Sequence, residues 1–282
     1  MKLAHEIADD GRFVRQPNRF TDPLGPPEPG RYRLYASYAC PWAQRVLIVR
    51  ALLRLEDVLD VVIVDPIRDE KGWRVPGGDP EYLSELYHAT DPGYQGRYTV
   101  PCVWDTREGR IVTNDFPRIT LDLETTWGSS PDLYPERLRP DIDIMNDRLY
   151  HGLNNAVYEA GFARGQQAYE EAVARVFSTL DSLEVRLSRS EFLFGSTLTE
   201  SDVRLYTTLA RFDTVYYSHF KCSVRRLTDY PALWAYARRL YAVPAFRDTT
   251  DFDHIKRHYY LTQTNLNPSR IVPVGPDLDW TL

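Results

Sequence analysis

The sequence predicts a small α/β domain followed by a larger all-helical domain. Up to about residue 127, β-type runs alternate with helical ones, and from Tyr134 onward the apolar residues recur only at helical spacings. The stretch "WGSSPDLYP" between the two patterns is rich in Gly, Ser and Pro, which is typical of a boundary. With 282 residues and 43% hydrophobic content, the chain is long enough to form both cores.

The elements of the first domain follow in order. "RYRLYASY" predicts a strand, and "PWAQRVLIVRALLRLE" predicts a helix with Pro41 at its first position, where a missing N–H is tolerated. "VVIVDP" predicts the next strand, and a long insertion rich in Gly, Pro and Asp follows it. "YTVPCVWD" and "RIVTN" predict a hairpin that turns at Glu108 and Gly109, and a helix is expected from about Asp115 to Trp127.

The second half shows three amphipathic helical patterns. "LTESDVRLYTTLARF" opens with Thr199 and, three residues later, Asp202, a pair suited to cap a helix. "YPALWAYARRLYAV" is a second pattern, and the third places one face of a helix at Val173, Val176, Phe177, Leu180, Leu183 and Leu187. We therefore expect an N-terminal extension over 1–30, an α/β domain over 31–127, a helical domain over 134–260 and a C-terminal tail over 261–282.

Composition limits the classes of partner. The formal charge of −6 and the pI near 5.6 argue against nucleic acid and anionic membranes as partners, and favour a small molecule. The N-terminus has no signal-peptide pattern and no run reaches membrane-spanning length, so we expect a cytoplasmic protein. Three scattered cysteines without metal-type spacing predict neither a disulfide framework nor a metal site. All but four of the 34 basic residues are arginine, which is our basis for suggesting a GC-rich genome.

Cys40 is the candidate nucleophile. It directly precedes the proline that begins a helix, and a helix N-terminus stabilises a thiolate, so such cysteines have pKa values of roughly 3.5–7.5 instead of ~8.5. In the dithiol redox motif a second cysteine stands three residues on, but Ala43 occupies that place here. A disulfide at Cys40 therefore needs an outside low-molecular-weight thiol to resolve it. The alternative is a buried, inert cysteine.

"TVPC" is the second indication of thiol chemistry. A proline inside a strand is unusual unless it marks an edge or a special backbone site. In thioredoxin-like folds the corresponding proline is cis, and the exposed amide of the preceding residue, here Val100, pairs with a thiol peptide. An ordinary edge-strand Pro101 is the alternative. Together with Cys40 and the element order, the pattern favours a thioredoxin-like domain, whereas Cys102 and Cys222 are expected to be packed apolar residues.

The chain resembles the glutathionyl-hydroquinone reductases, the Xi class of glutathione transferases, from about Phe20 to Asp279. The resemblance rests on long strings that include "ASYACPWAQR", "GWR", "GRYTVPCVWD", "LYPERLRPDID", "NNAVYEAGFA", "RFDTVYYSHFKC", "DHIKRHYY" and "NPSRIVPVGPDLD". It implies a thioredoxin-like domain joined to an all-helical glutathione-transferase domain, and a homodimer. It also implies that the Cys40 thiolate attacks the sulfur of a thiol-substituted hydroquinone and that a second thiol releases the mixed disulfide.

Site residues are carried over by position. Tyr158, Tyr216 and Tyr259 match the family's tyrosines around the aromatic substrate, where phenol hydroxyls can hydrogen-bond the quinol oxygens. On the thiol side, the positions that hold glutathione in the family are Trp73, Val100 with Pro101, and Asp115. With 19 tyrosines in the chain, packing alone is the alternative for any one of them.

Two departures affect the thiol site. The family usually has Asn-Glu-Ser at the start of the helix after "IV", where Glu and Ser hold the γ-glutamyl end of glutathione, but this chain reads Asn114-Asp115-Phe116-Pro117. Losing such polar partners can cost roughly 1–3 kcal/mol, or about tenfold to more than a hundredfold in affinity. The cosubstrate is then either weakly bound glutathione or another thiol such as mycothiol, which GC-rich actinobacteria use. In addition, Gln44 replaces the usual histidine of "CPWAHR".

Two other functions remain open. A general thiol–disulfide transferase, acting on small mixed disulfides or dehydroascorbate, needs Cys40 but not the tyrosines. A non-catalytic binding protein could keep the fold without the cosubstrate, and Phe116 and Pro117 are its best support.

Overall fold

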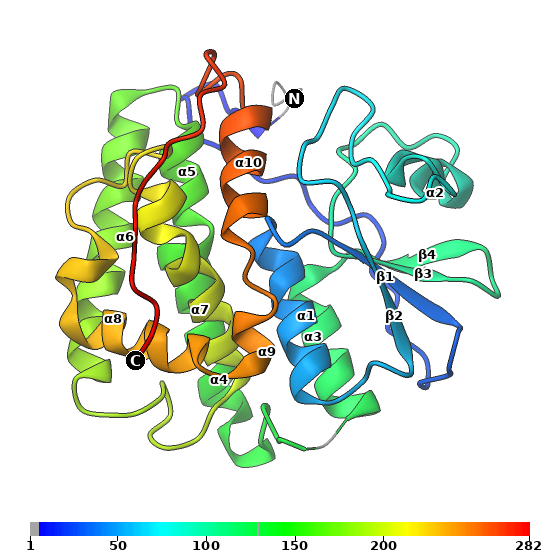
Figure 1. Ribbon diagram of the computed structural model, residues 1–282, viewed down its shortest axis with the longest axis horizontal. Helices are drawn as coiled ribbons and strands as arrows, with labels where there is room; N and C mark the ends of the chain where they lie inside the picture. Colours follow the sequence, from blue (N-terminus) through cyan, green and yellow to red (C-terminus); the bar gives the residue numbers. More distant parts are fainter. Residues whose placement is uncertain (1–5, 129) are drawn as a thin grey trace. The chain divides into compact units, whose positions relative to one another are not determined.

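A four-stranded mixed sheet forms in the first half of the chain (Figure 1). The strands lie in the order β2-β1-β3-β4, with β1 and β2 parallel and the other neighbours antiparallel. Their bounds are β1 Tyr32–Ala36, β2 Leu59–Ile63, β3 Cys102–Asp105 and β4 Arg110–Thr113. Parallel strands need a crossover, and α1, Pro41–Leu52, supplies it with Pro41 at its first turn, as the sequence predicts.

The β3–β4 hairpin is shorter than its sequence pattern. The strand β3 begins one residue after Pro101, because proline has no N–H to donate to a neighbouring strand. The chain turns at Gly109, whose φ of +65° lies in the left-handed region that glycine adopts without steric cost.

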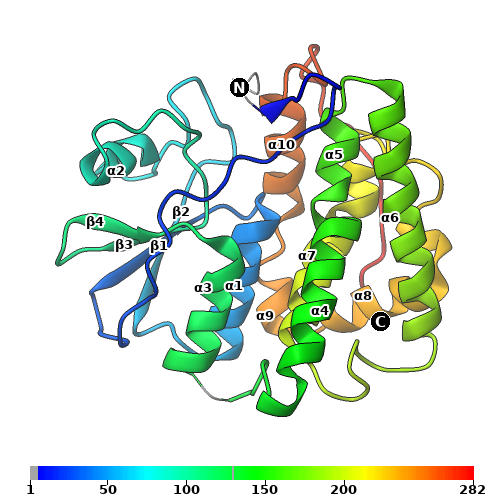
Figure 2. The ribbon, with the colours of Figure 1, turned by 180° about the vertical axis from the view of Figure 1, so that it is seen from behind.

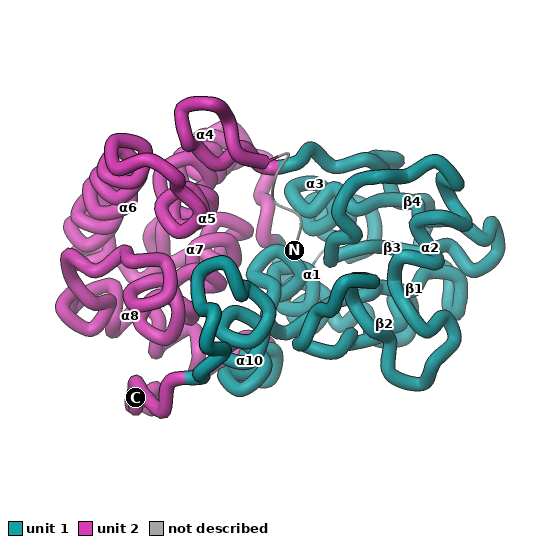
Figure 3. The backbone as a smooth tube through the Cα atoms, turned by 90° about the horizontal axis from the view of Figure 1, so that it is seen from above, with its two compact units in different colours: residues 1, 16–132, 248–272 teal, residues 2–15, 133–247, 273–282 magenta. Residues whose placement is uncertain are grey.

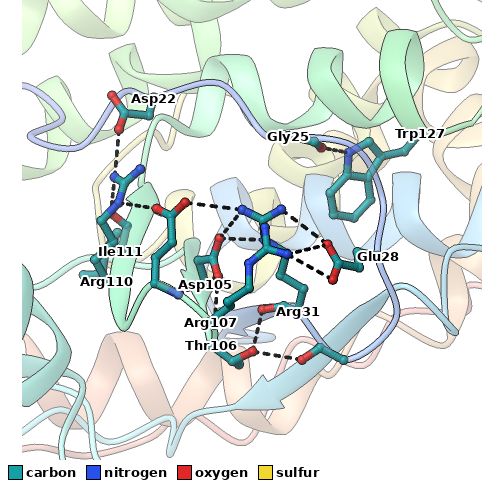
Figure 4. Close-up of polar contacts among 12 residues, drawn as sticks. Asp22, Gly25, Glu28, Arg31, Asp105, Thr106, Arg107, Arg110, Ile111 and Trp127 are labelled. Carbon is teal, nitrogen blue, oxygen red and sulfur yellow. Dashed lines mark hydrogen bonds and ion pairs between the residues drawn. The ribbon is translucent and has the colours of Figure 1, made fainter.

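Polar contacts tie the segment before β1 to this turn (Figure 4). Arg31 Nε donates to Asp105 Oδ2 at 2.8 Å, and Asp105 Oδ1 accepts the backbone N–H groups of Arg107 at 2.9 Å and Glu108 at 3.0 Å. Burial by itself raises the pKa of Asp105, but the bonds from Arg31 and the two backbone N–H groups outweigh it and hold that pKa below its ordinary value. The Asp105 carboxylate is therefore charged, and it joins Arg31 to the turn between β3 and β4.

Helices flank the sheet. The helices α1 and α3, Phe116–Asp122, pack against each other, and a π-helical turn, Leu123–Trp127, continues α3 to the predicted end (Figure 2). The helix α2, Leu83–Thr90, contacts β4 and was not predicted. It is short and lies in the Gly/Pro/Asp-rich insertion, and its start is closed by Glu85, whose Oε1 accepts the Tyr82 N–H at 2.8 Å.

The remaining helices follow Leu133. The capping pair predicted before α7 is present, since Asp202 accepts the N–H and hydroxyl of Thr199, both at 2.8 Å. The predicted apolar face of α6 is buried. The elements are α4 Arg139–Leu149, a second π-helical turn Tyr150–Asn154, α5 Ala156–Phe162, α6 Gln166–Leu187, α7 Glu200–Arg211, a third π-helical turn Phe212–Tyr216, α8 Pro231–Tyr241, α9 Pro244–Arg247 and α10 Phe252–Thr262, with short 3-10 turns at Glu136–Leu138 and Leu227–Asp229.

The computed structural model describes residues 6–128 and 130–282, and its contacts divide the chain into two units (Figure 3). Of the described residues, 16–128, 130–132 and 248–272 form the first unit, and 6–15, 133–247 and 273–282 form the second. The helix α10 therefore groups with the sheet. The four-part division predicted from the sequence stays a prediction, because grouping by contact does not test where separately folding domains end. Within the described residues, none of the helices is long and apolar enough to cross a membrane.

Candidate active site

Cys40 stands at the start of α1. It is the N-cap, with an extended backbone (φ −84°, ψ 118°). Its carbonyl oxygen accepts the first hydrogen bond of the helix, from the Gln44 N–H at 2.9 Å. Its side chain is half-buried. A 12-residue helix places the positive end of its dipole beside this sulfur. The local geometry is thus the one that favours a thiolate.

The segment before β3 meets this sulfur. The Val100–Pro101 peptide bond is cis, as the thioredoxin-like pattern predicts. In the thiol form, Cys40 Sγ donates to the Val100 carbonyl oxygen at 3.2 Å. The structure therefore joins the two parts of the sequence that indicated thiol chemistry, although 60 residues separate them.

The other two cysteines are not suited to this chemistry. Cys102 and Cys222 are both fully buried. Burial raises the pKa of the Cys102 thiol far above its ordinary value, and raises the pKa of Cys222 to about 12. Both side chains are packed, as predicted, and only Cys40 among the three reaches solvent.

The start of α3 carries the altered residues. Asp115 is the N-cap, its N–H donates to Thr113 Oγ1, and its Oδ1 accepts from Asn18 Nδ2, both at 3.0 Å. The Phe116 ring is 8% exposed and lies 4.4 Å from the Trp42 ring, centroid to centroid. Phe116 thus contributes packing against the "CPW" segment where the family offers a hydroxyl.

Asn114 was missed by the sequence analysis. Its Oδ1 accepts the backbone N–H groups of Arg19 and Phe20 at 3.2 and 3.0 Å, and its Nδ2 donates to Tyr87 Oη at 3.1 Å and Thr99 Oγ1 at 3.2 Å. It joins Thr99, the residue before Val100, to the backbone at Arg19 and Phe20. An amide between a strand and a helix is the available signal, but the sequence does not show that this one is buried.

Trp73 is buried in the first unit. Its side chain is 3% exposed and stacks on His258 of α10, with centroids 4.8 Å apart and planes inclined by 16°. The indole Nε1 is buried and meets no hydrogen-bond acceptor among the described residues. A buried N–H without an acceptor costs about 1–3 kcal/mol, so this atom suits a donor to a bound molecule.

Two of the three candidate tyrosines lie in the second unit, and the third lies in the first. Tyr158 and Tyr216 lie together in the second unit, with hydroxyl oxygens 3.4 Å apart, and are 8% and 0% exposed. Arg15, which was not singled out from the sequence, lies over the Tyr158 ring at 4.7 Å. Tyr259 belongs to the first unit, where its ring is 1% exposed and contacts His258 edge-on at 5.3 Å.

Family comparisons agree with this arrangement. Residues 39–126 match the family described as Glutathione S-transferase, N-terminal domain, and residues 166–239 match Glutathione S-transferase, C-terminal domain. With a thioredoxin-like sheet followed by a helical part, and a match to both models, the chain is a glutathione transferase by class.

Individual relatives narrow the class. The glutathionyl-hydroquinone reductase PcpF of Sphingobium chlorophenolicum is 45% identical over 94% of this chain and 90% of its own length. The crystal structure of the glutathione-S-transferase Xi from Phanerochaete chrysosporium is 44% identical, with a TM-score of 0.94 over 98% of this chain and 96% of that one. The glutathione-bound structure of YqjG from Escherichia coli K-12 is 41% identical, with a TM-score of 0.88 over 96% of both chains. The present chain belongs to the glutathionyl-hydroquinone reductase family, the Xi class of glutathione transferases, and is an enzyme of that family.

Proposed function

We propose that this enzyme removes a low-molecular-weight thiol from thiol-conjugated hydroquinones through a mixed disulfide at Cys40. The observation that carries the proposal is the half-buried Cys40 sulfur at the start of α1, 3.2 Å from the carbonyl that precedes the cis-proline. The likeness to PcpF, which is called a glutathionyl-hydroquinone reductase, supports the choice of substrate.

The reaction has two balanced steps. The Cys40 thiolate attacks the sulfur of the aryl thioether, a disulfide forms, and the carbon–sulfur bond breaks with its electron pair leaving on the ring carbon. That carbon takes a proton, and the free hydroquinone departs. A second thiol then attacks the mixed disulfide as its thiolate, releases a disulfide of two thiol molecules and restores Cys40. The thiol is oxidised, and the aromatic ring is reduced.

The tyrosines are proposed to serve the aromatic part of the substrate. Tyr158, Tyr216 and Tyr259 supply phenol hydroxyls that can hydrogen-bond the quinol oxygens or deliver the proton. The 3.4 Å separation of the Tyr158 and Tyr216 hydroxyls is suited to passing a proton between them.

On the thiol side, Trp73, Val100 with Pro101, and Asp115 are proposed to hold the cosubstrate. Glutathione is the cosubstrate that the glutathione-bound YqjG structure supports. Mycothiol is the alternative supported by Phe116, because a phenylalanine packed on Trp42 offers no hydrogen bond to a γ-glutamyl carboxylate. We further propose a cytoplasmic homodimer without metal, whose dimeric state light scattering can test.

The test measures hydroquinone release from a glutathione-conjugated hydroquinone. Cys40→Ser is expected to abolish release while the far-ultraviolet circular dichroism and melting temperature stay unchanged. The matched control is Cys222→Ala, which removes a buried thiol and should keep most activity. Unchanged turnover in Cys40→Ser would refute the proposal.

A general thiol–disulfide transferase needs the same cysteine, so the tyrosines separate the two activities. Tyr158→Phe, Tyr216→Phe and Tyr259→Phe should lower release of hydroquinone by roughly tenfold to a hundredfold, and leave reduction of a small mixed disulfide or dehydroascorbate nearly unchanged. No loss of either activity in these variants favours the general transferase, which does not need the tyrosines. Ligand binding without turnover under glutathione and mycothiol favours a non-catalytic protein.

A further inference from the structure

Trp73 and His258 are far apart in the sequence and form one stacked pair within the first unit. Trp73 lies in the long segment between β2 and α2, and His258 lies on α10. Their ring centroids are 4.8 Å apart and their planes are nearly parallel, at 16°. Trp73 is 3% exposed, and the stack is one of the contacts that orient its indole, together with Arg68, which lies over the ring at 5.4 Å.

His258 is held from a second side. Its Nδ1 lies 2.7 Å from the backbone carbonyl oxygen of Pro66. A carbonyl oxygen can only accept, so Nδ1 carries a hydrogen and donates it. One imidazole therefore covers one face of the Trp73 ring and also holds the backbone at Pro66, at the start of the segment that leads to Trp73.

The start of α10 is tied to the helix that carries Cys40. Gln44 Nε2 donates to the Thr249 carbonyl at 3.1 Å and to Thr250 Oγ1 at 2.8 Å. One residue on, Asp251 caps α10 by accepting the His254 N–H at 2.9 Å. The helix α10, which carries His258, is thus anchored at its start to α1, which begins after Cys40.

We propose that His258 is a positioning residue for the thiol cosubstrate. It holds the Trp73 indole so that the buried N–H, which meets no acceptor among the described residues, donates to a carboxylate or amide carbonyl oxygen of the thiol. The inference rests on the proposed function only for the mixed disulfide at Cys40, since it concerns the thiol and not the hydroquinone.

The test follows release of that mixed disulfide. The enzyme is first loaded at Cys40 with glutathione by treatment with glutathione disulfide, and the release rate is measured against glutathione concentration. The experiment is repeated with mycothiol disulfide and mycothiol. Trp73→Phe keeps an aromatic ring and removes the donor, and should raise the half-saturating concentration roughly tenfold or more for the thiol that binds there.

His258→Phe keeps a ring for the stack and loses the bond to the Pro66 carbonyl. It should raise the same concentration about threefold to tenfold, with the limiting rate unchanged. Dithiothreitol offers no carboxylate or amide, so its release of the adduct should be the same in every variant. In the double variant, His258→Phe should add nothing to Trp73→Phe, because it acts through that indole.

Multiplicative effects in the double variant, or equal slowing with dithiothreitol, would overturn the proposal in favour of a merely structural role. If Trp73→Phe fails to fold, His258→Phe alone decides, and an unchanged half-saturating concentration sinks the idea. A wild-type enzyme that releases no hydroquinone would contradict the proposed function and leave this measurement, which needs no hydroquinone, unaffected.

Discussion

Two helices of the first unit, α1 and α3, begin with similar sequence patterns but place different chemical groups at their N-termini. Each has a proline in its first turn and a polar residue at its N-cap, Cys40 in one and Asp115 in the other. The cysteine is half-buried and lies against the Val100 carbonyl. The aspartate is bonded to Asn18 and is followed by a phenylalanine packed on Trp42.

The difference between the two helix starts suggests that one serves the reaction and the other serves recognition of the thiol. At the start of α1, Cys40 and Pro41 match the pattern that the family resemblance implies, whereas at the start of α3 Phe116 and Pro117 stand where that pattern has a hydroxyl and a backbone donor. A thiolate needs only a helix end and access, but a cosubstrate is selected by the particular donors and acceptors that meet it. We therefore expect family chemistry with an altered thiol preference.

The largest effect should be seen in adduct formation. After incubation with glutathione disulfide or mycothiol disulfide, intact-mass analysis should find one adduct, on Cys40, and none in Cys40→Ser. Cys102 and Cys222 should stay free, because burial raises the pKa of both thiols. A second adduct on either buried cysteine would break the contrast between the two helix starts.

Asn114 directly precedes Asp115 and donates to Thr99, the residue before Val100, so its loss should disturb both segments. Asn114→Ala removes bonds to the N–H groups of Arg19 and Phe20 and to Thr99, and should cost about 2–3 kcal/mol, or roughly 5–10 °C in melting temperature. The control is Asn18→Ala, which loses one bond to Asp115 and should cost less than about 1 kcal/mol. Equal losses of stability in the two variants would contradict the inference that Asn114 holds these segments together.

Asp105 tests whether stability by itself changes thiol chemistry, because it lies at the other end of β3. Asp105→Asn should cost about 2 kcal/mol at neutral pH and leave the half-saturating thiol concentration unchanged. The folded-state pKa is below the ordinary value of 3.8, so the stabilisation is fully present above that pH and is lost as pH falls through the lower value. The gap in melting temperature between wild type and variant should stay constant from pH 7 to about pH 5 and shrink below about pH 4. A gap that widens in acid would contradict the charge assignment.

The smallest effect concerns the missing hydroxyl. Asp115→Glu combined with Phe116→Ser should lower the half-saturating glutathione concentration about tenfold relative to Asp115→Glu with Phe116→Ala. Both double variants lose the ring that packs on Trp42, so the comparison isolates the hydroxyl. Mycothiol should not distinguish them. No gain with glutathione would mean that the start of α3 does not contact this thiol.

The sequence predicted the α/β-then-helical order, the strand–helix–strand start, the first turn of α1 and the capping pair before α7, because these depend on neighbouring residues. It did not predict α2, whose eight residues are too few to show a period within the Gly/Pro-rich insertion. It also did not single out Asn114 or His258, since an amide or imidazole in the sequence does not reveal what it will meet.

By itself, the sequence determined where a reactive sulfur could lie: a lone cysteine before a helix-starting proline, with no second cysteine to resolve it. Only the tertiary structure decided what surrounds that sulfur. It set the Val100 carbonyl against Cys40, the Phe116 ring against Trp42 and the His258 imidazole against Trp73. Helix starts follow from local backbone sterics and unpaired N–H groups, whereas these contacts join residues 60 or more positions apart and exist only once the core has packed.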